Sequence, residues 1–280
     1  MDAYSFLKPA DQKDGFWGPV TSTIDWCELN YTHSHYVAEW FNTLSCVPPI
    51  LWSVYSAAQG YRAGAPTSVV LLPLWTAVVF AGSIAFHGTL LWETQLMDEL
   101  PMLWQMSYAI YAIFDLGRLP GAPFLLAAWD VAIAVGYVLF PYPVGFQVGY
   151  FIMFWTQYLR TIVLLRRYPK DHPAREQLWF SYFGNALCLV AFAIWNVDSQ
   201  FCPSLRELRR WVGANGLGWL GFLSEGHAWW HLLMGYGSYL VGVALVQAVL
   251  IVQRPNESWR CDAKAWFPLY YRVDKDKKKE

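Results

Sequence analysis

The chain has 280 residues, of which 56% are hydrophobic, 18% are aromatic and only 15% are charged. A soluble domain typically carries about 25% charged residues, so this composition excludes a water-soluble globular protein. The formal net charge of −1 at pH 7 gives no reason to expect a nucleic-acid partner, and we infer no obligate protein partner. The composition predicts an integral membrane protein.

Seven apolar stretches have roughly the 20 residues that a helix needs to cross a bilayer. They cover 36–60, 68–91, 97–117, 122–141, 144–166, 177–197 and 218–252. Turns rich in proline and glycine separate them, and these two residues mark helix ends. The sequence therefore predicts an all-α membrane protein, a seven-transmembrane helix bundle over 36–252. An N-terminal segment over 1–35 precedes the bundle, and a basic tail over 253–280 follows it.

The positive charges predict how the bundle is oriented. With seven spans, the segments on one side hold 15 of the 20 Lys and Arg residues. Cytosolic segments carry the excess of positive charge, so we expect a cytosolic C-terminus and a luminal or extracellular N-terminus. Lys277 and Lys278 stand fourth and third from the end, as in a dilysine signal for retrieval to the endoplasmic reticulum. A polybasic tail facing the membrane is an equally good interpretation.

The N-terminal segment carries acidic and amide side chains at short spacing, at Asp25, Glu28, Asn30 and Glu39. Hard oxygen ligands so close together suit Ca²⁺, although spacing alone favours an ordinary acidic cap on the first helix. Asn30 also begins the glycosylation sequon NYT. One side chain cannot serve as both a glycan acceptor and a calcium ligand.

Polar residues also occur inside the predicted spans, where they are costly and mark functional sites by default. Ser83 and His87 lie one helical turn apart near the end of the second span, and Asp98 lies near the start of the third. Each has an ordinary alternative, since Ser83 can bond its own helix backbone, His87 can be a packing residue, and Asp98 suits a helix N-terminus. Asp130 lies in the middle of the fourth span, and the sequence offers no partner for it.

Two of the five cysteines fall on the side that we expect to be luminal, where disulfides persist. They are Cys27 and Cys202. Spacing cannot prove a bridge, but the compartment makes this the sensible pair.

The seventh predicted span contains His227 and His231, one helical turn apart in SEGHAWWHLLMG. Two imidazoles so placed can hold a metal, clamp a haem, relay protons or pack against neighbouring helices. The seven-span topology places them at a depth similar to that of His87 and Asp98. Three histidines with the fourth position left open are the pattern of a catalytic zinc site, whereas a haem needs axial histidines on facing helices. The common depth therefore favours zinc.

Five motifs of the chain resemble, in order and spacing, those of the alkaline ceramidases. They are GFWGPVTSTIDWCELNY, YVAEWFNTLS, FHGTLLWETQLMDELPM, WNVDSQFC and GHAWWHLLMGYGSYL, and the similarity runs from about residue 15 to about residue 245. The resemblance implies a seven-helix intramembrane amidase of the endoplasmic reticulum and Golgi. Such an enzyme hydrolyses ceramides to a sphingoid base and a free fatty acid, so a ceramide-type lipid is the expected substrate.

The resemblance also implies roles for single residues. The family's zinc ligands fall on His87, His227 and His231, and its serine and aspartate fall on Ser83 and Asp98. Its calcium ligands fall on Asp25, Trp26 (through the backbone carbonyl), Glu28, Asn30 and Glu39, which replaces the capping interpretation. The family commonly reads HMTLKY where this chain has HGTLLW, a departure that touches no implied ligand.

These residues are consistent with amide hydrolysis. Zinc chemistry activates water and polarises a carbonyl. Asp98 is expected to take a proton from the attacking water and pass it to the leaving amine, and Ser83 to hydrogen-bond the oxyanion.

Two other classes of protein share part of the pattern. A seven-transmembrane lipid-sensing receptor of the adiponectin-receptor type keeps three zinc histidines, but it lacks the DWCE…N segment and has a cytosolic N-terminus. A haem protein or proton-coupled transporter needs the histidine pair but neither Ser83 nor Asp98. The acidic segment, the charge distribution and the serine–aspartate pair therefore favour the amidase.

Overall fold

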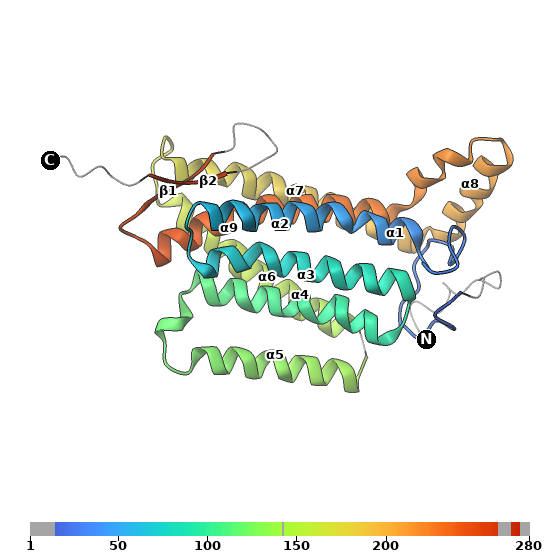
Figure 1. Ribbon diagram of the computed structural model, residues 1–280, viewed down its shortest axis with the longest axis horizontal. Coiled ribbons are helices and arrows are strands. Elements are labelled where there is room, and N and C mark those ends of the chain that lie inside the picture. Colours follow the sequence, from blue (N-terminus) through green and yellow to red (C-terminus); the bar gives the residue numbers. More distant parts are fainter. Residues whose placement is uncertain (1–14, 142, 263–269, 275–280) are drawn as a thin grey trace. The chain divides into compact units, whose positions relative to one another are not determined.

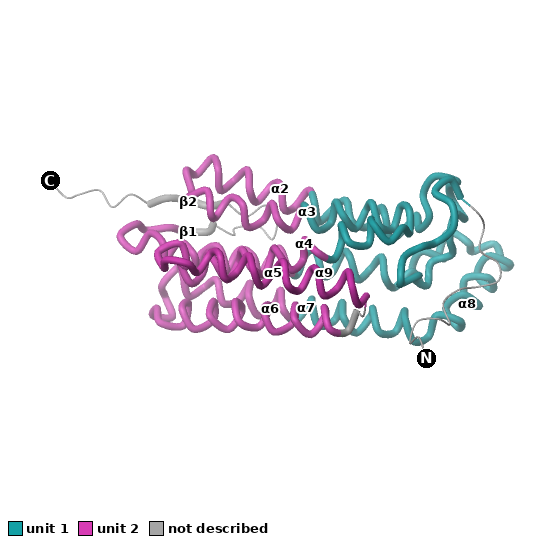
Figure 2. The backbone as a smooth tube through the Cα atoms, turned by 90° about the horizontal axis from the view of Figure 1, so that it is seen from below, with its two compact units in different colours: residues 1–50, 78–99, 186–237 teal, residues 51–77, 100–185, 238–280 magenta. Residues whose placement is uncertain are grey.

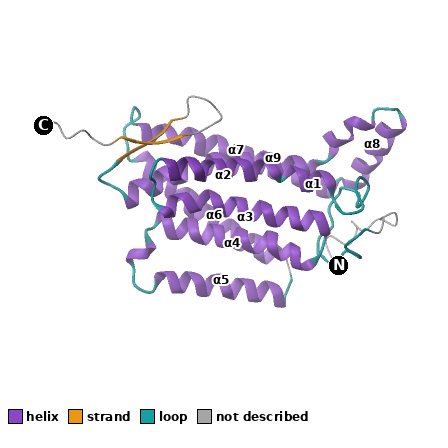
Figure 3. Ribbon diagram, in the orientation of Figure 1, coloured by secondary structure: helices purple, strands orange, loops and turns teal. Residues whose placement is uncertain are grey.

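The computed structural model describes residues 15–141, 143–262 and 270–274 of the chain. Nearly all of the regular structure in these residues is helical, and a single two-stranded hairpin follows the last helix (Figure 1, Figure 3). Lys277 and Lys278, with their dilysine arrangement, lie outside the described residues.

The long helices follow the predicted spans. The first span is covered by α1 (Trp40–Ser45) and α2 (Val47–Arg62) together. The other six are covered by α3 (Thr67–Thr89), α4 (Trp92–Ile113), α5 (Ala122–Leu139), α6 (Pro143–Arg166), α7 (Pro173–Gln200) and α9 (Gly226–Gln253). Five of them, α3, α5, α6, α7 and α9, are long and apolar enough to cross a membrane. The expectation of an all-α membrane protein is therefore confirmed.

The other two long helices, α2 and α4, are not both long and apolar enough to meet this criterion for a membrane span. Helix α2 has only 16 residues, because the chain breaks its helical run at Cys46. Helix α4 has 22 residues, but Glu93, Asp98 and Glu99 lie in its first half. Acidic residues lower the apolarity of a span sharply.

Several elements were not predicted. Between α7 and α9 the chain forms the helix α8 (Cys202–Ala214) and the 3₁₀ helix η3 (Gly218–Ser224), and a short 3₁₀ helix η2 (Leu116–Arg118) precedes α5. The last long helix therefore begins at Gly226 and not at 218, where the glycine-rich stretch GANGLGWLG disfavours an α-helix. In the tail, β1 (Ser258–Asp262) pairs antiparallel with β2 (Tyr270–Asp274), with Ser258 opposite Asp274.

The chain folds into two compact units (Figure 2). Unit 1 consists of residues 1–50, 78–99 and 186–237, and unit 2 of residues 51–77, 100–185 and 238–280. Helices α2, α3, α4, α7 and α9 each contribute residues to both. The units are therefore not successive sequence domains.

In unit 1 the N-terminal segment binds the end of α3. The last carbonyls of a helix have no partner within it, and here the segment supplies the donors. The amide of Glu39 donates to the carbonyl of His87 (2.9 Å), and the amides of Thr21 and Ser22 both donate to Leu90 (3.1 Å each). Leu90 is fully buried and adopts a left-handed conformation with φ 54°. The acidic residues of the segment are thereby fixed beside the end of α3.

Apolar packing holds the same segment in place. Ile24, Trp26 and Tyr31 form one buried cluster with Phe86 and Leu90 of the α3 end. Burying such side chains stabilises the fold by about 1.5–3 kcal/mol each. The segment is therefore part of the core of unit 1.

Candidate metal centre

Three buried histidines meet in unit 1. His87 comes from α3, and His227 and His231 come from the first turns of α9. The ring centroids lie 5.0 Å apart for His87 and His227, 4.8 Å for His87 and His231, and 4.6 Å for the two residues of α9. One ring nitrogen of each lies within 4.8 Å of the other two. The three residues selected from spacing and depth thus form one group that could hold a metal ion.

Ring nitrogens of this group lack hydrogen-bond partners. Among the described residues, both ring nitrogens of His227 and Nε2 of His231 are buried without a partner. A buried polar atom left unpaired costs about 1–3 kcal/mol, so several in one cluster call for an explanation. Neutral imidazole nitrogens are good metal ligands, and three of them leave a fourth tetrahedral position for water. A zinc ion fits this donor set.

Hydrogen bonds from outside the group select the ring nitrogens that can bind a metal. The Ser45 hydroxyl donates to the carbonyl of Asn42 (2.8 Å), so it accepts from Nδ1 of His231 (2.8 Å). Nδ1 of His87 donates to the Glu39 carboxylate (2.5 Å). A proton on Nδ1 leaves Nε2 with a free lone pair, and such outer partners orient metal-binding histidines. Both contacts join residues far apart in sequence and were not predicted.

His227 is positioned by ring stacking. The indole of Trp26 stacks on its imidazole with ring centroids 3.9 Å apart and an interplanar angle of 25°. Trp230 stacks against it as well, at 5.0 Å. The family resemblance implied a role for Trp26 only through its backbone carbonyl, and in the structure that carbonyl accepts from Arg206 (3.2 Å).

The structure also brings Ser83 and Asp98 together. Ser83 is buried on α3, Asp98 is half-buried on α4, and the serine hydroxyl donates to the carboxylate. The neighbouring residue, Gly82, makes this approach feasible, because a Cβ there would stand only 1.9 Å from the carbonyl oxygen of Met97. Ser83 lies on α3 one turn before His87.

The acidic residues of the N-terminal segment are buried as well. Asp25, Glu28, Asn30 and Glu39 all lie in unit 1 and are at most 5% exposed. The Asn30 amide donates to the Asp25 carboxylate (3.1 Å). Asn30 is only 3% exposed, so attachment of a glycan to its side chain would require this segment to rearrange.

Glu28 caps the first helix. Its carboxylate accepts from the amides of Phe41 (2.7 Å) and Asn42 (2.9 Å), the second and third residues of α1. Burial and the nearby Glu39 carboxylate raise the pKa of Glu28 to about 8. Among the described residues, the three histidines are the group of histidine, cysteine or acidic side chains whose ligand atoms converge closely enough for a metal. The acidic cluster does not reach that convergence.

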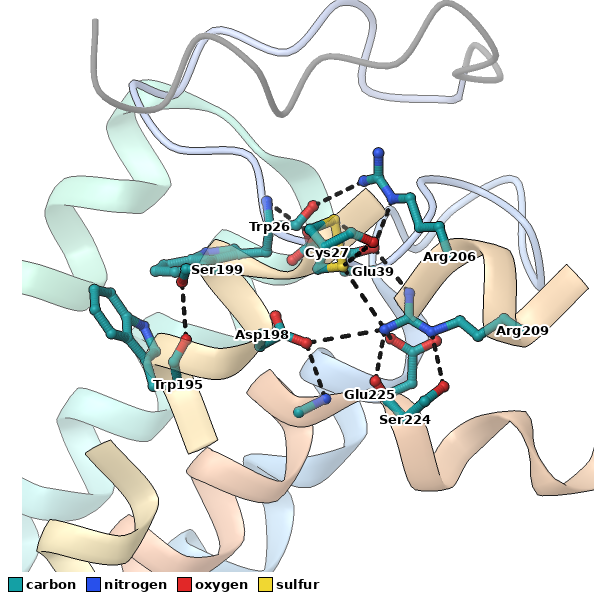
Figure 4. Close-up of a disulfide and its surroundings, with 12 residues drawn as sticks. Trp26, Cys27, Glu39, Trp195, Asp198, Ser199, Arg206, Arg209, Ser224 and Glu225 are labelled. Atoms are coloured by element: carbon teal, nitrogen blue, oxygen red, sulfur yellow. Dashed lines mark hydrogen bonds and ion pairs between the residues drawn. A yellow bond between two sulfur atoms is a disulfide. The ribbon is translucent and has the colours of Figure 1, made fainter. Parts of the chain in front are cut away.

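The two cysteines form a disulfide within unit 1. Cys27 of the N-terminal segment is bonded to Cys202 at the start of α8, with Cα atoms 5.3 Å apart and a sequence separation of 175 (Figure 4). Both are buried, and Leu205 packs against them. The link ties α8 to the segment that carries Trp26.

Arg209 of α8 joins three further parts of unit 1 (Figure 4). It donates to the carbonyl of Cys27 (2.9 Å) and to the carbonyl of Ser224 (2.7 Å), and it forms an ion pair with Glu225 (2.9 Å). Glu225 directly precedes α9, and the Asp198 carboxylate accepts from the first amide of that helix, at Gly226 (3.0 Å). The start of α9, and with it His227, is thus held by α7 and α8. The arginines of LRELRRW were a visible signal for this role, but the sequence alone did not say what they would contact.

Asp130 does not belong to this group. It lies in unit 2 on α5, where the hydroxyl of Ser107 on α4 donates to its carboxylate (2.5 Å).

Comparison with known proteins identifies relatives over most of the chain. A sequence model of the ceramidase family matches residues 18–270. Alkaline ceramidase 3 of Mus musculus is 35% identical over 239 residues, which cover 84% of this chain and 86% of the relative. Alkaline ceramidase of Arabidopsis thaliana is 28% identical over 96% of this chain and 99% of its own length. Alkaline ceramidase YPC1 of Saccharomyces cerevisiae is 31% identical, with coverages of 88% and 82%.

Proposed function

The chain belongs to the ceramidase family, and we propose that it hydrolyses the amide bond of ceramides at the three-histidine group, with one zinc ion held there. The products are a sphingoid base and a free fatty acid. The observation that carries the proposal is the set of buried, unpartnered imidazole nitrogens of His227 and His231 beside His87. The names of the relatives support the substrate class.

The protein supplies the proton transfers and the orientation of the reacting groups. His87, His227 and His231 would hold the zinc ion, which when bound would supply Lewis-acid activation of water and of the amide carbonyl. The Asp98 carboxylate accepts a proton from the attacking water and delivers it to the leaving nitrogen. The Ser83 hydroxyl, which donates to Asp98 in the resting protein, is then a donor for the developing oxyanion.

We also propose that the chemistry takes place inside the membrane. His87 lies near the end of the apolar helix α3 and His227 near the start of α9, and both helices are candidate membrane spans. The region 36–252 then forms the membrane domain, with the segment 1–35 in the lumen and the tail 253–280 in the cytosol. The excess of positive charge on one side supports this orientation. We place the protein in the endoplasmic reticulum or Golgi.

We further propose that Ca²⁺ binds the N-terminal cluster, through Asp25, Glu28, Asn30, Glu39 and the carbonyl of Trp26. Several carboxyl groups are buried together there, and the raised pKa of Glu28 reflects the cost of their charge. A cation lowers that cost, and small rearrangements of the carboxylates would complete the coordination. Glu39 also contacts His87, so a cation in the cluster would help to orient a zinc ligand.

The test is product formation by the purified protein. Detergent-solubilised ceramide should release fatty acid and sphingoid base in equal amounts, and the rate should fall below neutral pH because protonated histidines leave a metal. His87→Ala, purified in parallel, should release neither product. A zinc-loaded parent protein that cleaves no member of a ceramide panel would contradict the proposal and favour a lipid-sensing receptor.

A further inference from the structure

Unit 2 contains a cavity of about 380 Å³ that is open on one side and is lined by residues of α3, α4 and α5. Its lining includes Trp75, Trp104, Ser107, Tyr108, Tyr111 and Asp130. None of the lining residues belongs to the three-histidine group, to the Ser83–Asp98 pair or to the acidic cluster. The cavity is therefore a second site whose role the proposed function does not explain.

Asp130 is the one acidic or basic residue in the apolar helix α5. Ser107 of α4 donates to its carboxylate (2.5 Å), a contact that joins the two helices. A neutral side chain such as asparagine would provide the same contact without a charge in the membrane. Among the described residues Asp130 forms no ion pair. A carboxyl group in an apolar helix without an ion-pair partner among the described residues points to a cation from outside the chain.

Four aromatic rings surround the same space. Trp75 lies 6.4 Å from Trp104 and 6.3 Å from Tyr108 between ring centroids, and Tyr108 stacks on Tyr111 at 6.1 Å. The faces of aromatic rings carry partial negative charge and attract ammonium groups, and tryptophan does so best. A carboxylate beside several such rings is the chemistry that recognises an alkylated amine.

The surroundings of the cavity suit an alkyl chain. Only 6% of the residues in the apolar stretch of α5 are buried within the protein. Phe124 and Leu125, in the first turn of α5, are 80% and 75% exposed. Hydrocarbon chains would cover these side chains in a bilayer. A lipid chain can therefore lie along α5 while its head group enters the cavity.

We propose that this cavity binds the ammonium group of a lipid amine, with Asp130 as the counter-ion and the four aromatic rings around the cation. Ceramide has a neutral amide at the corresponding position, so the cavity would distinguish a free sphingoid base from its N-acylated form by charge alone. The identification of the sphingoid base as a ligand rests on the proposed function, but the affinity for an alkylammonium group does not. The ammonium head of phosphatidylethanolamine has the same chemistry and is the second source.

The probe is dodecyltrimethylammonium, which carries a permanent positive charge on a single chain, and dodecanol is its neutral match. Binding to the purified full-length protein in neutral detergent is measured by isothermal titration calorimetry. Asp130→Asn removes the charge and keeps an acceptor for Ser107, and it should weaken binding of the cation on the order of 10-fold while binding of the alcohol stays the same. Ser107→Ala, which keeps the charge, should retain most of the affinity.

Two further arms complete the experiment. Sphingosine and phosphatidylethanolamine are each added as competitors of the bound probe, and displacement by one of them identifies that lipid as the source of the ammonium group. Equal binding of the cation by the parent and by Asp130→Asn, in proteins with the same thermal stability, would overturn the proposal. Binding of dodecanol as tight as that of the cation would overturn it too. This experiment does not measure hydrolysis. A negative binding result would therefore not contradict the proposed function.

Discussion

The three-histidine group and the Asp130 cavity both contain polar side chains of apolar helices, but these side chains differ in their burial and in the number of their partners. The three histidines are each at most 2% exposed, whereas in the apolar stretch of α5, which carries Asp130, only 6% of the residues are buried. His87 and His231 each have an outer partner from another segment, at Glu39 and Ser45. Asp130 has Ser107 and an open cavity beside it. A buried, multiply supported group is suited to hold a metal in fixed geometry, and a half-buried side chain beside an open cavity is suited to exchange a lipid ligand.

The largest effect should follow from removing a member of the buried group. His231→Ala should lose tightly bound zinc and with it all measurable ceramide hydrolysis, because two imidazoles cannot complete the site. Zinc per chain is measured by plasma emission spectrometry after dialysis. The matched control is His172→Ala, which changes an exposed histidine outside unit 1 and should keep both zinc and activity. Full zinc retention by His231→Ala would remove this residue from the site.

The next effect should come from the proton acceptor. Asp98→Asn is nearly isosteric and is not a proposed ligand, so zinc and fold should remain while the rate falls by about 10²–10⁴-fold. Ser83→Ala should cost less, on the order of 10²-fold. Initial rates with one ceramide at saturating concentration measure both, and Glu93→Gln, an exposed acid on the same helix, is the control. A parent-like rate in zinc-loaded Asp98→Asn would show that another group moves the proton.

A smaller change is expected at the partner of His87. Glu39→Gln removes the charged acceptor of the Nδ1 proton, and the loss of such outer partners typically costs about 10–100-fold in metal affinity. Competition for zinc with a chromogenic chelator measures this, and Glu257→Gln outside unit 1 is the control. Added Ca²⁺ should raise the zinc affinity of Glu39→Gln less than it raises the zinc affinity of the parent, since the Glu39 carboxylate is also a proposed calcium ligand. Unchanged zinc affinity would mean that Glu39 does not position His87.

The supporting links should affect stability more than chemistry. Glu225 is buried and Arg209 is nearly so, with side chains 8% and 10% exposed, and breaking one partner of a buried pair costs about 3–5 kcal/mol. Arg209→Gln should therefore lower the melting temperature clearly, while Arg210→Gln, one residue on and exposed, should not. Replacing Cys27 and Cys202 by serine should lower the free energy of unfolding by about 2–5 kcal/mol. Equal melting temperatures for Arg209→Gln and Arg210→Gln would show that the contacts of Arg209 contribute little.

The comparison of the two regions also shows which features the sequence could predict. The apolar stretches predicted the long helices because burial in a membrane requires about 20 apolar residues whatever their order. The histidine group could be predicted from the sequence because His227 and His231 are one turn apart and His87 was expected at the same depth. The capping interpretation of the acidic cluster describes what Glu28 does at α1.

The contacts that support the site could not be predicted from local patterns. Glu39 and His87 are 48 positions apart, Ser45 and His231 are 186 apart, and the stacking of Trp26 on His227 depends on where the N-terminal segment packs. Helix α8 was missed because its arginines look like ordinary loop charges until their partners at Cys27 and Glu225 are known. Ser107 could not be assigned to Asp130, because many polar residues lie at a depth where they could meet it.

The most direct test of the central claim is a zinc titration of the metal-stripped protein, with ceramide hydrolysis measured at each step. We predict no hydrolysis without metal, a rise in proportion to bound zinc, and saturation of both at about one zinc per chain, as three imidazoles and one open position require. In His227→Ala neither binding nor hydrolysis should rise. Hydrolysis at the full rate in the stripped protein, or saturation with zinc without any hydrolysis, would contradict the claim.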